Sequence, residues 1–314
     1  MSTSASVKLR YEKCLGIWGN AIQSMAKIRV ISFFDKQSNT YSYVVADTYA
    51  GCCAVLDAVM DFDFASGVAS YASANQIIAF VRQQGWQLDW VLETHVHADH
   101  LSAGRYIQQQ LGGRLGIGDQ ITQVQTVFSD VFNVEPDFVC DGQQFDKLFA
   151  DNEVFFVGGL QVKVLQTPGH TPACVTYLFD NTCAFVGDTL FMPDFGTARC
   201  DFPGGDARQL FKSIQRLLCL SGDTQLYICH DYPTANRSQL MNMTTVDEQR
   251  RFNIHVHEGM LEDDFVRTRS YRDAQLPMPR LLMPSVQVNM RGGSFPPADA
   301  NGKFFLKVPF NIRD

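Results

Sequence analysis

The sequence predicts an α/β protein in which several strands end at side chains that can bind a metal. Short apolar runs rich in β-branched residues alternate with longer segments whose apolar residues recur at helical spacing. Histidine or aspartate follows four of the short runs. The chain is 46% hydrophobic and 19% charged, so it can bury the core of an ordinary globular protein.

The elements alternate along most of the chain. The predicted strands share short apolar runs and cover residues 28–34, 41–45, 54–56, 88–92, 158–165, 175–179, 183–187 and 226–229. The predicted helices share apolar residues three and four positions apart and cover residues 74–84, 103–111 and 206–220. Glycine stops the first two helices, at Gly85 and Gly112. The apolar, aromatic run 124–139 is expected to form a lid or a wall of a pocket.

A dense group of metal-capable side chains follows the strand predicted at 88–92. Residues 94–100 read Thr-His-Val-His-Ala-Asp-His and contain three of the chain's seven histidines. Imidazole and carboxylate are common ligands of transition metals. A loop directly after a strand is held by a rigid scaffold and still faces solvent. The spacing therefore predicts a metal site and disfavours a chance cluster of surface polar residues.

Three further predicted strands also end at a metal-capable residue. These residues are His170, Asp188 and His230. Five of the seven histidines thus lie on four strand ends. Independent structural histidines would not all fall at such positions, so we expect one site assembled from four strands.

Composition divides the chain into three parts. They are an N-terminal extension (1–27), a central domain (28–240) and a C-terminal appendage (241–314). The first 24 residues are basic and serine-rich, as in an organellar transit peptide, although a functional start at Met25 fits equally well. The appendage opens with a charged, helical stretch from Thr245 to Phe265. The prolines that follow predict an extended, turn-rich tail that packs on the core.

Charge and hydropathy exclude several classes of partner. The formal net charge is −7, and long Lys/Arg runs are absent. Nucleic-acid backbones are bound by clustered Lys and Arg, so we expect no nucleic-acid partner. No apolar run approaches the ~18 residues of a spanning helix, so we expect no membrane association. The oligomeric state stays open, with a homodimer as one option.

The nine cysteines are scattered and form no C-x-x-C pair. An odd number without a framework argues against disulfides and favours a reducing compartment, which we expect to be the cytoplasm. A transit peptide in residues 1–24 would instead direct the chain to mitochondria. Four cysteines lie near the metal-capable residues, namely Cys174, Cys183, Cys200 and Cys229. We interpret them as buried packing, with a redox-sensitive thiol as the alternative.

Four motifs together resemble the metallo-β-lactamase superfamily. They are T-H-V-H-A-D-H (94–100), T-P-G-H-T (167–171), G-D-T-L-F (187–191) and C-H-D-Y (229–232). The resemblance implies a four-layer αββα sandwich, with two central sheets between helices and a short C-terminal extension. Residues 28–240 would form its catalytic domain, and 241–314 an appendage packed on that core.

Within the superfamily, the sequence resembles the persulfide dioxygenases (sulfur dioxygenases) and the glyoxalase II hydrolases. Segments 34–45, 245–253, 276–279 and 286–289 are similar to the opening and the tail of the dioxygenases. Glyoxalase II enzymes usually end in a different, helical thioester-binding domain. Segment 196–202 departs from the dioxygenase pattern, because it is longer and has Cys200 in place of threonine.

The dioxygenase resemblance implies a non-heme iron enzyme that oxidises glutathione persulfide with O₂ to sulfite and glutathione. One Fe(II) would be held by His95, His170 and Asp188, which are the expected catalytic residues. The remaining members of the superfamily's two-metal set are His97, Asp99, His100 and His230. Asp99, His100 and His230 would orient ligands and bound water, or all four would complete a site for two zinc ions. The alternative function is then a glyoxalase II-like, zinc-dependent hydroxyacylglutathione thioester hydrolase.

The expected substrate-binding residues are Arg250, Tyr232 and Arg199. The resemblance places Arg250 and Tyr232 at positions that contact the glutathionyl group, and arginine binds carboxylates bidentately. An ion pair of Arg250 with Asp247 on a helix surface fits the spacing equally well. Arg199 could instead brace the loop after Asp188 together with Asp201.

Two further features carry weaker predictions. Asp57 is expected to orient the metal loop or to cap a turn. His255 and His257 form an H-x-H pair without an obvious third donor, so we expect them on a solvated helix face.

Overall fold

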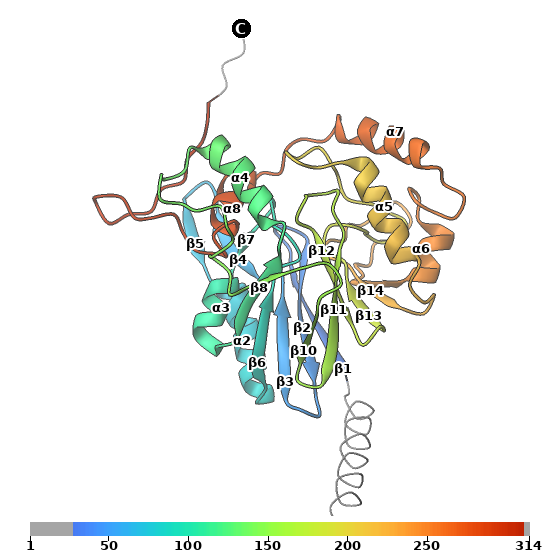
Figure 1. Cartoon of the computed structure of the whole chain (residues 1–314), viewed down its shortest axis with the longest axis horizontal. Helices are drawn as coiled ribbons and strands as arrows, with labels where there is room; N and C mark the ends of the chain where they lie inside the picture. Colours follow the sequence, from blue (N-terminus) through green and yellow to red (C-terminus); the bar gives the residue numbers. More distant parts are fainter. Residues whose placement is uncertain (1–27, 311–314) are drawn as a thin grey trace, which may run out of the picture.

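The computed structural model describes residues 28–310 and consists of two β-sheets packed face to face between layers of helices (Figure 1). The first sheet has the order β1 (Ile28–Asp35), β2 (Thr40–Asp47), β3 (Cys52–Leu56), β6 (Gln87–Leu92), β8 (Arg114–Gly118) and β9 (Lys147–Phe149). The second has the order β10 (Val154–Val157), β11 (Leu160–Gln166), β12 (Val175–Phe179), β13 (Cys183–Phe185), β14 (Gln225–Tyr227) and β15 (Met243–Thr245). A small third sheet is formed by β5 (Val68–Ser70), β4 (Val59–Asp63) and β7 (Leu101–Ser102).

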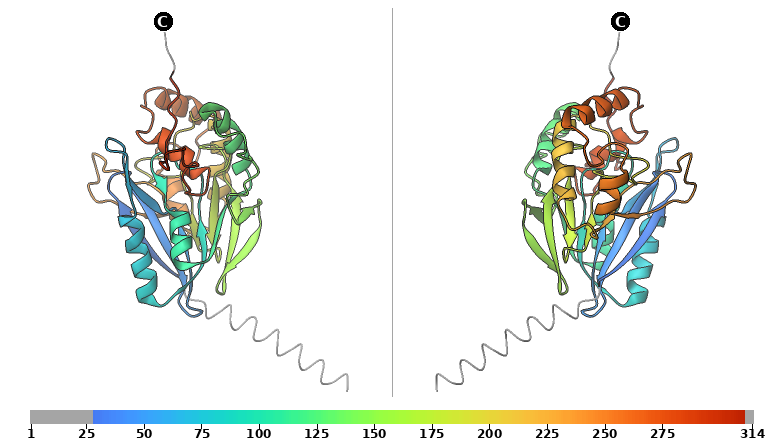
Figure 2. Two further views of the ribbon diagram at one scale, coloured as in Figure 1. Left: turned by 90° about the vertical axis from the view of Figure 1, so that its left-hand side faces the viewer. Right: turned by 90° about the vertical axis from the view of Figure 1, so that its right-hand side faces the viewer.

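Helices cover the outer faces of both large sheets, and the side views show the sheets between them (Figure 2). The helices on the first sheet's side are α2 (Ala72–Gln84), α3 (Gly104–Leu111), α4 (Ile121–Phe132) and α8 (Leu282–Asn289). Those on the second sheet's side are α5 (Ala207–Leu218), α6 (Val246–Phe252) and α7 (Glu262–Asp273). The predicted αββα sandwich is confirmed.

Local sequence explains the main elements. Every residue of β2 is buried, because one face of its sheet meets the second sheet and the other meets helices. Its sequence, Thr-Tyr-Ser-Tyr-Val-Val-Ala-Asp, accordingly does not sustain the alternation of apolar and polar residues that a strand with one solvated face shows. Helix α5 begins where the Asp206 side chain accepts a hydrogen bond from the Gln209 N–H at 2.8 Å. Helix α2 ends at Gly85, which adopts a left-handed conformation with φ 68°.

Two predicted segments have a different structure. Residues 121–132 form helix α4, whose Val124 and Phe128 are buried in the core, so the run is not a lid. Both side chains line a small pocket, which was the alternative expectation. The tail predicted as extended contains helix α8, and its Pro284 does not prevent this. Pro284 lies in the first turn, where a backbone N–H has no intrahelical acceptor to lose.

The sequence also missed several short strands, and β8 shows why. Its residues Arg-Leu-Gly-Ile-Gly contain two glycines, which depress strand propensity. Gly116 is needed because an added Cβ would lie 2.5 Å from the Phe149 ring. Packing therefore selects a residue that the propensity of an isolated strand disfavours.

The C-terminal segment is integrated into the layers. β15 lies beyond the boundary drawn at residue 240, and it pairs with β14 at the edge of the second sheet. Helix α7 packs on α5, and α8 packs on β7 and α4. The predicted N-terminal extension lies outside the described residues. Among residues 28–310, no helix is long and apolar enough to cross a membrane.

Candidate metal centre

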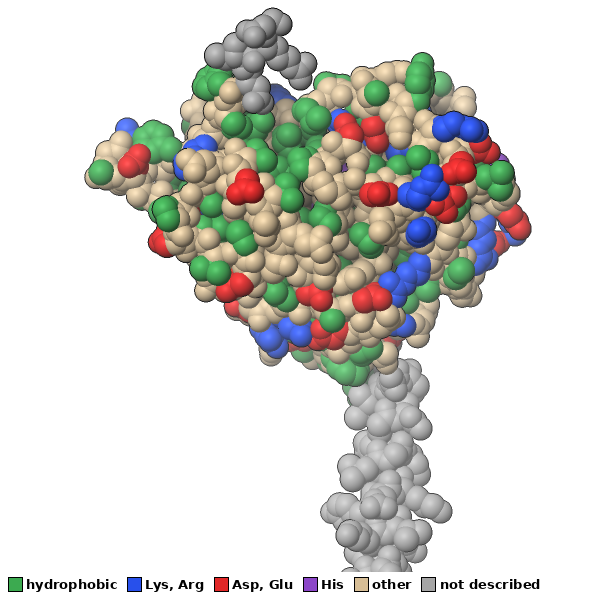
Figure 3. All heavy atoms as spheres, turned by 45° about the horizontal axis from the view of Figure 1, so that its top comes forward, with side chains coloured by type: hydrophobic (Ala, Val, Ile, Leu, Met, Phe, Trp, Pro, Cys, Tyr) green, Lys and Arg blue, Asp and Glu red, His purple; other side chains and the backbone are tan. Residues whose placement is uncertain are grey.

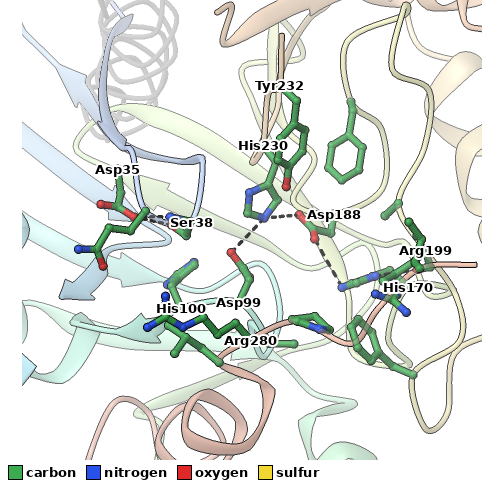
Figure 4. Close-up of a pocket in the computed structure, with 18 of the residues that line it drawn as sticks. Asp35, Ser38, Asp99, His100, His170, Asp188, Arg199, His230, Tyr232 and Arg280 are labelled. Carbon is green, nitrogen blue, oxygen red and sulfur yellow. Dashed lines mark hydrogen bonds and ion pairs between the residues drawn. The ribbon is translucent and has the colours of Figure 1, made fainter. Parts of the chain in front are cut away.

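The four predicted strand ends meet at one place. His95 follows β6 in the first sheet, whereas His170, Asp188 and His230 follow β11, β13 and β14 in the second. Figure 4 shows His170, Asp188 and His230 side by side, with Asp99 opposite His230. The motif loop thus faces the second sheet, and its side chains are brought to those of the other three strands.

A compact group of two histidines and one aspartate lies at the centre. The Nε2 atom of His170 is 3.5 Å from Oδ2 of Asp188, and that of His95 is 4.0 Å from the same oxygen. The three ligand atoms lie within 4.8 Å of one another, and all three residues are buried. A two-histidine, one-carboxylate group with room for further ligands is typical of non-heme iron sites.

Hydrogen bonds to Nδ1 direct the Nε2 atoms into the site. Nδ1 of His170 is 2.8 Å from the Arg199 carbonyl oxygen, and Nδ1 of His100 is 3.1 Å from that of Leu101. Nδ1 of His230 is 3.2 Å from the Asn39 carbonyl oxygen. A carbonyl only accepts, so each of these Nδ1 atoms carries a proton, and Nε2 is the ring nitrogen that faces the site as a possible ligand.

Unpaired buried atoms are the test of whether a metal fits. The Nε2 atoms of His95 and His100 and the Oδ1 atom of Asp188 are buried without a hydrogen-bond partner among the described residues. A buried unpaired lone pair is costly, whereas a cation would use all three. The donor set therefore fits a metal ion.

The other predicted ligands surround this group. His230 Nε2 lies 3.3 Å from Asp188 Oδ1 and 3.6 Å from Asp99 Oδ2. Burial opposes ionisation of Asp99, but the positive charge of His230 prevails and lowers the pKa of Asp99 to about 2. Burial lowers the pKa of His100 to about 4, so its ring is neutral at pH 7. Both side chains are therefore in the protonation state that a metal needs.

His97 is held differently from the other histidines. Its Nε2 atom lies 3.1 Å from Asp57 Oδ1 and 3.6 Å from Glu93 Oε2, while its buried Nδ1 atom has no hydrogen-bond partner in the described chain. Asp57 also accepts hydrogen bonds from the Thr94 N–H at 2.7 Å and the Thr94 hydroxyl at 2.9 Å. Asp57 thus orients the metal loop, which was one of the two roles expected for it; the other was to cap a turn. Glu93, a buried acid at a strand end, was missed by the sequence analysis.

Asn289 of α8 is a second missed residue. Its side-chain amide donates hydrogen bonds to the carbonyl oxygens of His97 at 2.9 Å and His100 at 2.8 Å. Its carbonyl oxygen accepts one from the Ser102 N–H at 2.7 Å. A residue of the C-terminal helix therefore clamps the backbone of the metal loop.

The site opens into a cavity of about 430 Å³. Asp99, His100, His170, Asp188 and His230 line its metal end. Aromatic side chains line its wall, namely Phe62, Phe191, Phe195, Phe202 and Tyr232. Arginines complete the lining, namely Arg199, Arg269, Arg272 and Arg280. An apolar cavity with a few placed polar groups is typical of a small-molecule site.

Comparison with known proteins identifies the family. Residues 36–230, more than half of the chain, match the family model described as the metallo-beta-lactamase superfamily. The chain belongs to the metallo-β-lactamase superfamily.

Relatives within this superfamily carry several names. A "Probable metallo-hydrolase" of Burkholderia pseudomallei (strain 1710b) is 49% identical, over 90% of this chain and 99% of that protein. "Glyoxylase B2" of Dictyostelium discoideum is 43% identical, over 92% and 99% respectively. "Persulfide dioxygenase ETHE1, mitochondrial" of Bos taurus is 27% identical, over 86% and 91%. The crystal structure of ETHE1 from Myxococcus xanthus is 26% identical, with a TM-score of 0.66 over 85% of this chain and 99% of that one.

The chain is therefore an enzyme of the metallo-β-lactamase superfamily with a His/Asp cluster for a metal. The names of its relatives leave the reaction open between hydrolysis and oxygenation.

Two of the three expected substrate-binding residues, Tyr232 and Arg199, line the cavity next to the metal cluster. Tyr232 stacks on Phe195 with ring centroids 4.7 Å apart. Arg199 also lines the cavity, but both of its hydrogen bonds to Asp201 are 2.6 Å long, and it donates to the Pro277 carbonyl oxygen at 2.7 Å. These bonds brace the loop after Asp188, which was the alternative prediction for Arg199.

Arg250 does not reach the cavity, and its expected substrate contact is corrected here. Its guanidinium donates hydrogen bonds of 2.8 Å to the carbonyl oxygens of Leu218 and Leu220. Those carbonyls lie at the C-terminal end of α5, where no intrahelical donor remains for them. A contact with Asp247 at 3.8 Å adds the ion pair that was the alternative prediction.

The prediction for the H-x-H pair is wrong for His255. α6 ends at Phe252, and the following turn buries His255, which is 5% exposed. Its Nδ1 atom accepts a hydrogen bond from the Thr197 N–H at 3.1 Å. His255 thus supports the loop after Asp188, whereas His257 is exposed.

The cysteines near the site are buried thiols. Cys174, Cys183, Cys200 and Cys229 are at most 7% exposed. Burial raises the pKa of Cys174 to about 12, so this thiol stays neutral at pH 7 and is a weak nucleophile. These cysteines serve packing, as predicted.

Proposed function

We propose that this enzyme is a non-heme iron persulfide dioxygenase that converts glutathione persulfide and O₂ to sulfite and glutathione. The observation that carries this proposal is the compact group of His95, His170 and Asp188. The residues of a second metal site are less well gathered, because Asp99 and His100 group with His97, whereas His230 groups with Asp188 and Cys229. This asymmetry favours one metal ion over two.

The net reaction defines what the site must do. Glutathione persulfide, O₂ and one water give glutathione, sulfite and two protons. The persulfide as a whole loses four electrons, which O₂ accepts. The sulfur–sulfur bond breaks with its electron pair on the inner sulfur, which takes up a proton to form the S–H bond of the thiol. When bound, Fe(II) supplies the one-electron chemistry with O₂ that side chains cannot perform.

The protein's own residues would hold the metal, orient the substrate and shield the reacting sulfur from water. His95, His170 and Asp188 would hold the iron, with Asp188 offsetting part of its charge. The aromatic wall, including Phe191, Phe202 and Tyr232, excludes water from the reacting sulfur. The cavity admits the substrate with its persulfide end towards Asp188.

The C-terminal tail supports the same reading. The similarity to the bovine persulfide dioxygenase spans 91% of that protein, and the tail segment 286–289 resembles the dioxygenases. In this chain the last residue of that segment, Asn289, clamps the metal loop. The tail is therefore part of the metal site's support rather than a separate substrate-binding domain.

The second candidate is a glyoxalase II-like thioester hydrolase with two zinc ions. The unpaired Nε2 atom of His100 and the ionised Asp99 beside it favour this alternative. Two zinc ions would lower the pKa of a bound water and generate a hydroxide nucleophile.

One experiment separates the two reactions. The protein is purified under anaerobic conditions, its iron and zinc are measured, and O₂ uptake with glutathione persulfide is followed. We expect about one iron per chain and O₂ uptake that yields sulfite. Zinc, hydrolysis of S-lactoylglutathione and no O₂ uptake would refute the dioxygenase.

Substitution of single ligands tests the number of metals. His170→Ala should lose the iron, because it removes one of three ligands. His230→Ala should retain most of it, because His230 would act only through Asp188 and Asp99. Equal loss of metal from both variants would favour a two-metal site.

We further propose the cytoplasm as the compartment. The eight cysteines in the described part of the chain are all free thiols, which fits a reducing environment.

A further inference from the structure

The cavity is lined by side chains of both charges. Asp99 and Asp188 carry carboxylates at the metal cluster, and Arg272 and Arg280 line the same cavity together with Leu276 and Leu281. Figure 4 shows Arg280 on the side of the cavity next to His100 and Asp99. Arg272 and Arg280 come from α7 and from the segment that joins α7 to α8.

Two of the four cavity arginines are already neutralised. Arg199 forms its two-bonded ion pair with Asp201. Arg269 is buried and lies 2.6 Å from Asp273 Oδ1, and it donates to the Thr197 carbonyl oxygen at 2.9 Å. These two guanidinium groups are therefore already paired with carboxylates of the protein.

Arg272 and Arg280 are different, because neither side chain makes a hydrogen bond or an ion pair with any residue in the range 28–310. Partial burial and the charge of Arg269 lower the pKa of Arg272, and the charge of Asp273 offsets only part of this effect. Asp273 is itself bound to Arg269. Arg280 lies within electrostatic range of the exposed Asp63 but does not bind it.

The other acids that line the cavity do not supply the missing partner. Asp35 accepts hydrogen bonds from the N–H and the hydroxyl of Ser38, at 2.8 and 2.6 Å. Asp61 is bound in the same way by Ser73, at 2.9 and 2.6 Å. The two free cations therefore face the cavity without a carboxylate of the protein to pair with.

We propose that Arg272 and Arg280 bind the carboxylates of the thiol carrier and make the enzyme selective for persulfides whose carrier bears carboxylates. The persulfide as substrate rests on the proposed function, whereas the binding of carboxylates by these two arginines does not. The guanidinium fork matches a carboxylate with two parallel hydrogen bonds.

The substitutions are Arg272→Gln, Arg280→Gln and the double variant. Both arginines are exposed and unbonded, so their replacement should leave the fold unchanged. Arg267→Gln is the matched control, because Arg267 is an exposed arginine of α7 that pairs with Asp264 and does not line the cavity. Figure 3 shows positive and negative side chains interspersed over α5 and α7, where Arg208 pairs with Glu262 and Asp263.

The first measurement is the Kd of glutathione on the metal-loaded full chain, by calorimetry. Glutathione is the thiol carrier in both candidate reactions, so this readout does not depend on the chemistry. We expect each single variant to weaken binding about three- to tenfold, since an exposed charge-assisted pair is partly screened. Arg267→Gln should bind like the wild type. Unchanged binding in the double variant would overturn the proposal.

The second measurement is O₂ uptake with two persulfides, those of glutathione and of the uncharged thiol 2-mercaptoethanol. The variants should raise KM for the former by the same factor, with kcat nearly unchanged, and leave KM for the latter unaltered. An equal rise for both persulfides would contradict carboxylate recognition, as would tighter binding of a phosphate-bearing thiol than of glutathione. Weaker glutathione binding without any O₂ uptake would support the anion site and refute only the dioxygenase.

Discussion

Asn289→Ala tests whether the C-terminal helix holds the metal loop in place. The Asn289 side chain is 4% exposed and makes three hydrogen bonds to the backbone of residues 97–102. Alanine removes the two donors and the acceptor together. The carbonyl oxygens of His97 and His100 and the N–H of Ser102 would then be buried without these partners.

The expected loss of stability follows from the number of bonds. Each internal hydrogen bond contributes about 1 kcal/mol, so Asn289→Ala should lower the free energy of unfolding by about 3 kcal/mol. For a chain of this size that corresponds to a fall in Tm of about 6 °C. The metal loop also loses its backbone support, so the metal affinity should fall at least about tenfold.

Gln287→Ala is the matched control on the same helix. Gln287 is 3% exposed and also makes three hydrogen bonds, at 2.8 Å to Met283 and at two 2.9 Å contacts to Lys307. None of them reaches the metal loop. Both variants are compared by urea denaturation and by metal content after dialysis against a weak chelator. We expect similar destabilisation and a loss of metal only in Asn289→Ala, and equal metal content in the two variants would refute the clamp.

Two further substitutions test the packing around the site. Gly169→Ala should lower the free energy of unfolding, measured by denaturation, by about 3 kcal/mol. The added Cβ would lie 2.3 Å from the Leu210 backbone, next to the metal-binding residue His170. Gly259 also has a positive φ but has open space around it, so Gly259→Ala should lower the free energy of unfolding by only about 1 kcal/mol. Equal destabilisation by the two substitutions would mean that backbone strain, and not the contact with Leu210, is responsible. Arg250→Ala should lower stability by about 1–2 kcal/mol, because it exposes the end of α5, yet leave the Kd of glutathione unchanged. A weakened Kd in that variant would restore Arg250 as a substrate ligand.

The sequence was sufficient to predict the fold class and the members of the metal cluster. Both depend on local patterns, because a strand's apolar run and the ligand at its end are adjacent in the chain. His95, His170, Asp188 and His230 each follow such a run, and the structure brings them together. The sequence analysis did not predict the short strands that contain glycine, such as β8, because their residues suit contacts across the sheet rather than the propensity of an isolated strand.

The tertiary structure alone decided what lies around the cluster. Arg250 seemed to be a substrate ligand by its position in a motif, but the packing of α6 turns it to the end of α5. Arg272, Arg280 and Asn289 stand in segments without a distinctive local pattern, and their surroundings depend on how α7 and α8 return across the sandwich. The contact between Asn289 and His97 spans 192 positions in the chain. Such distant contacts arise from the packing of whole layers, and no periodicity of nearby residues encodes them.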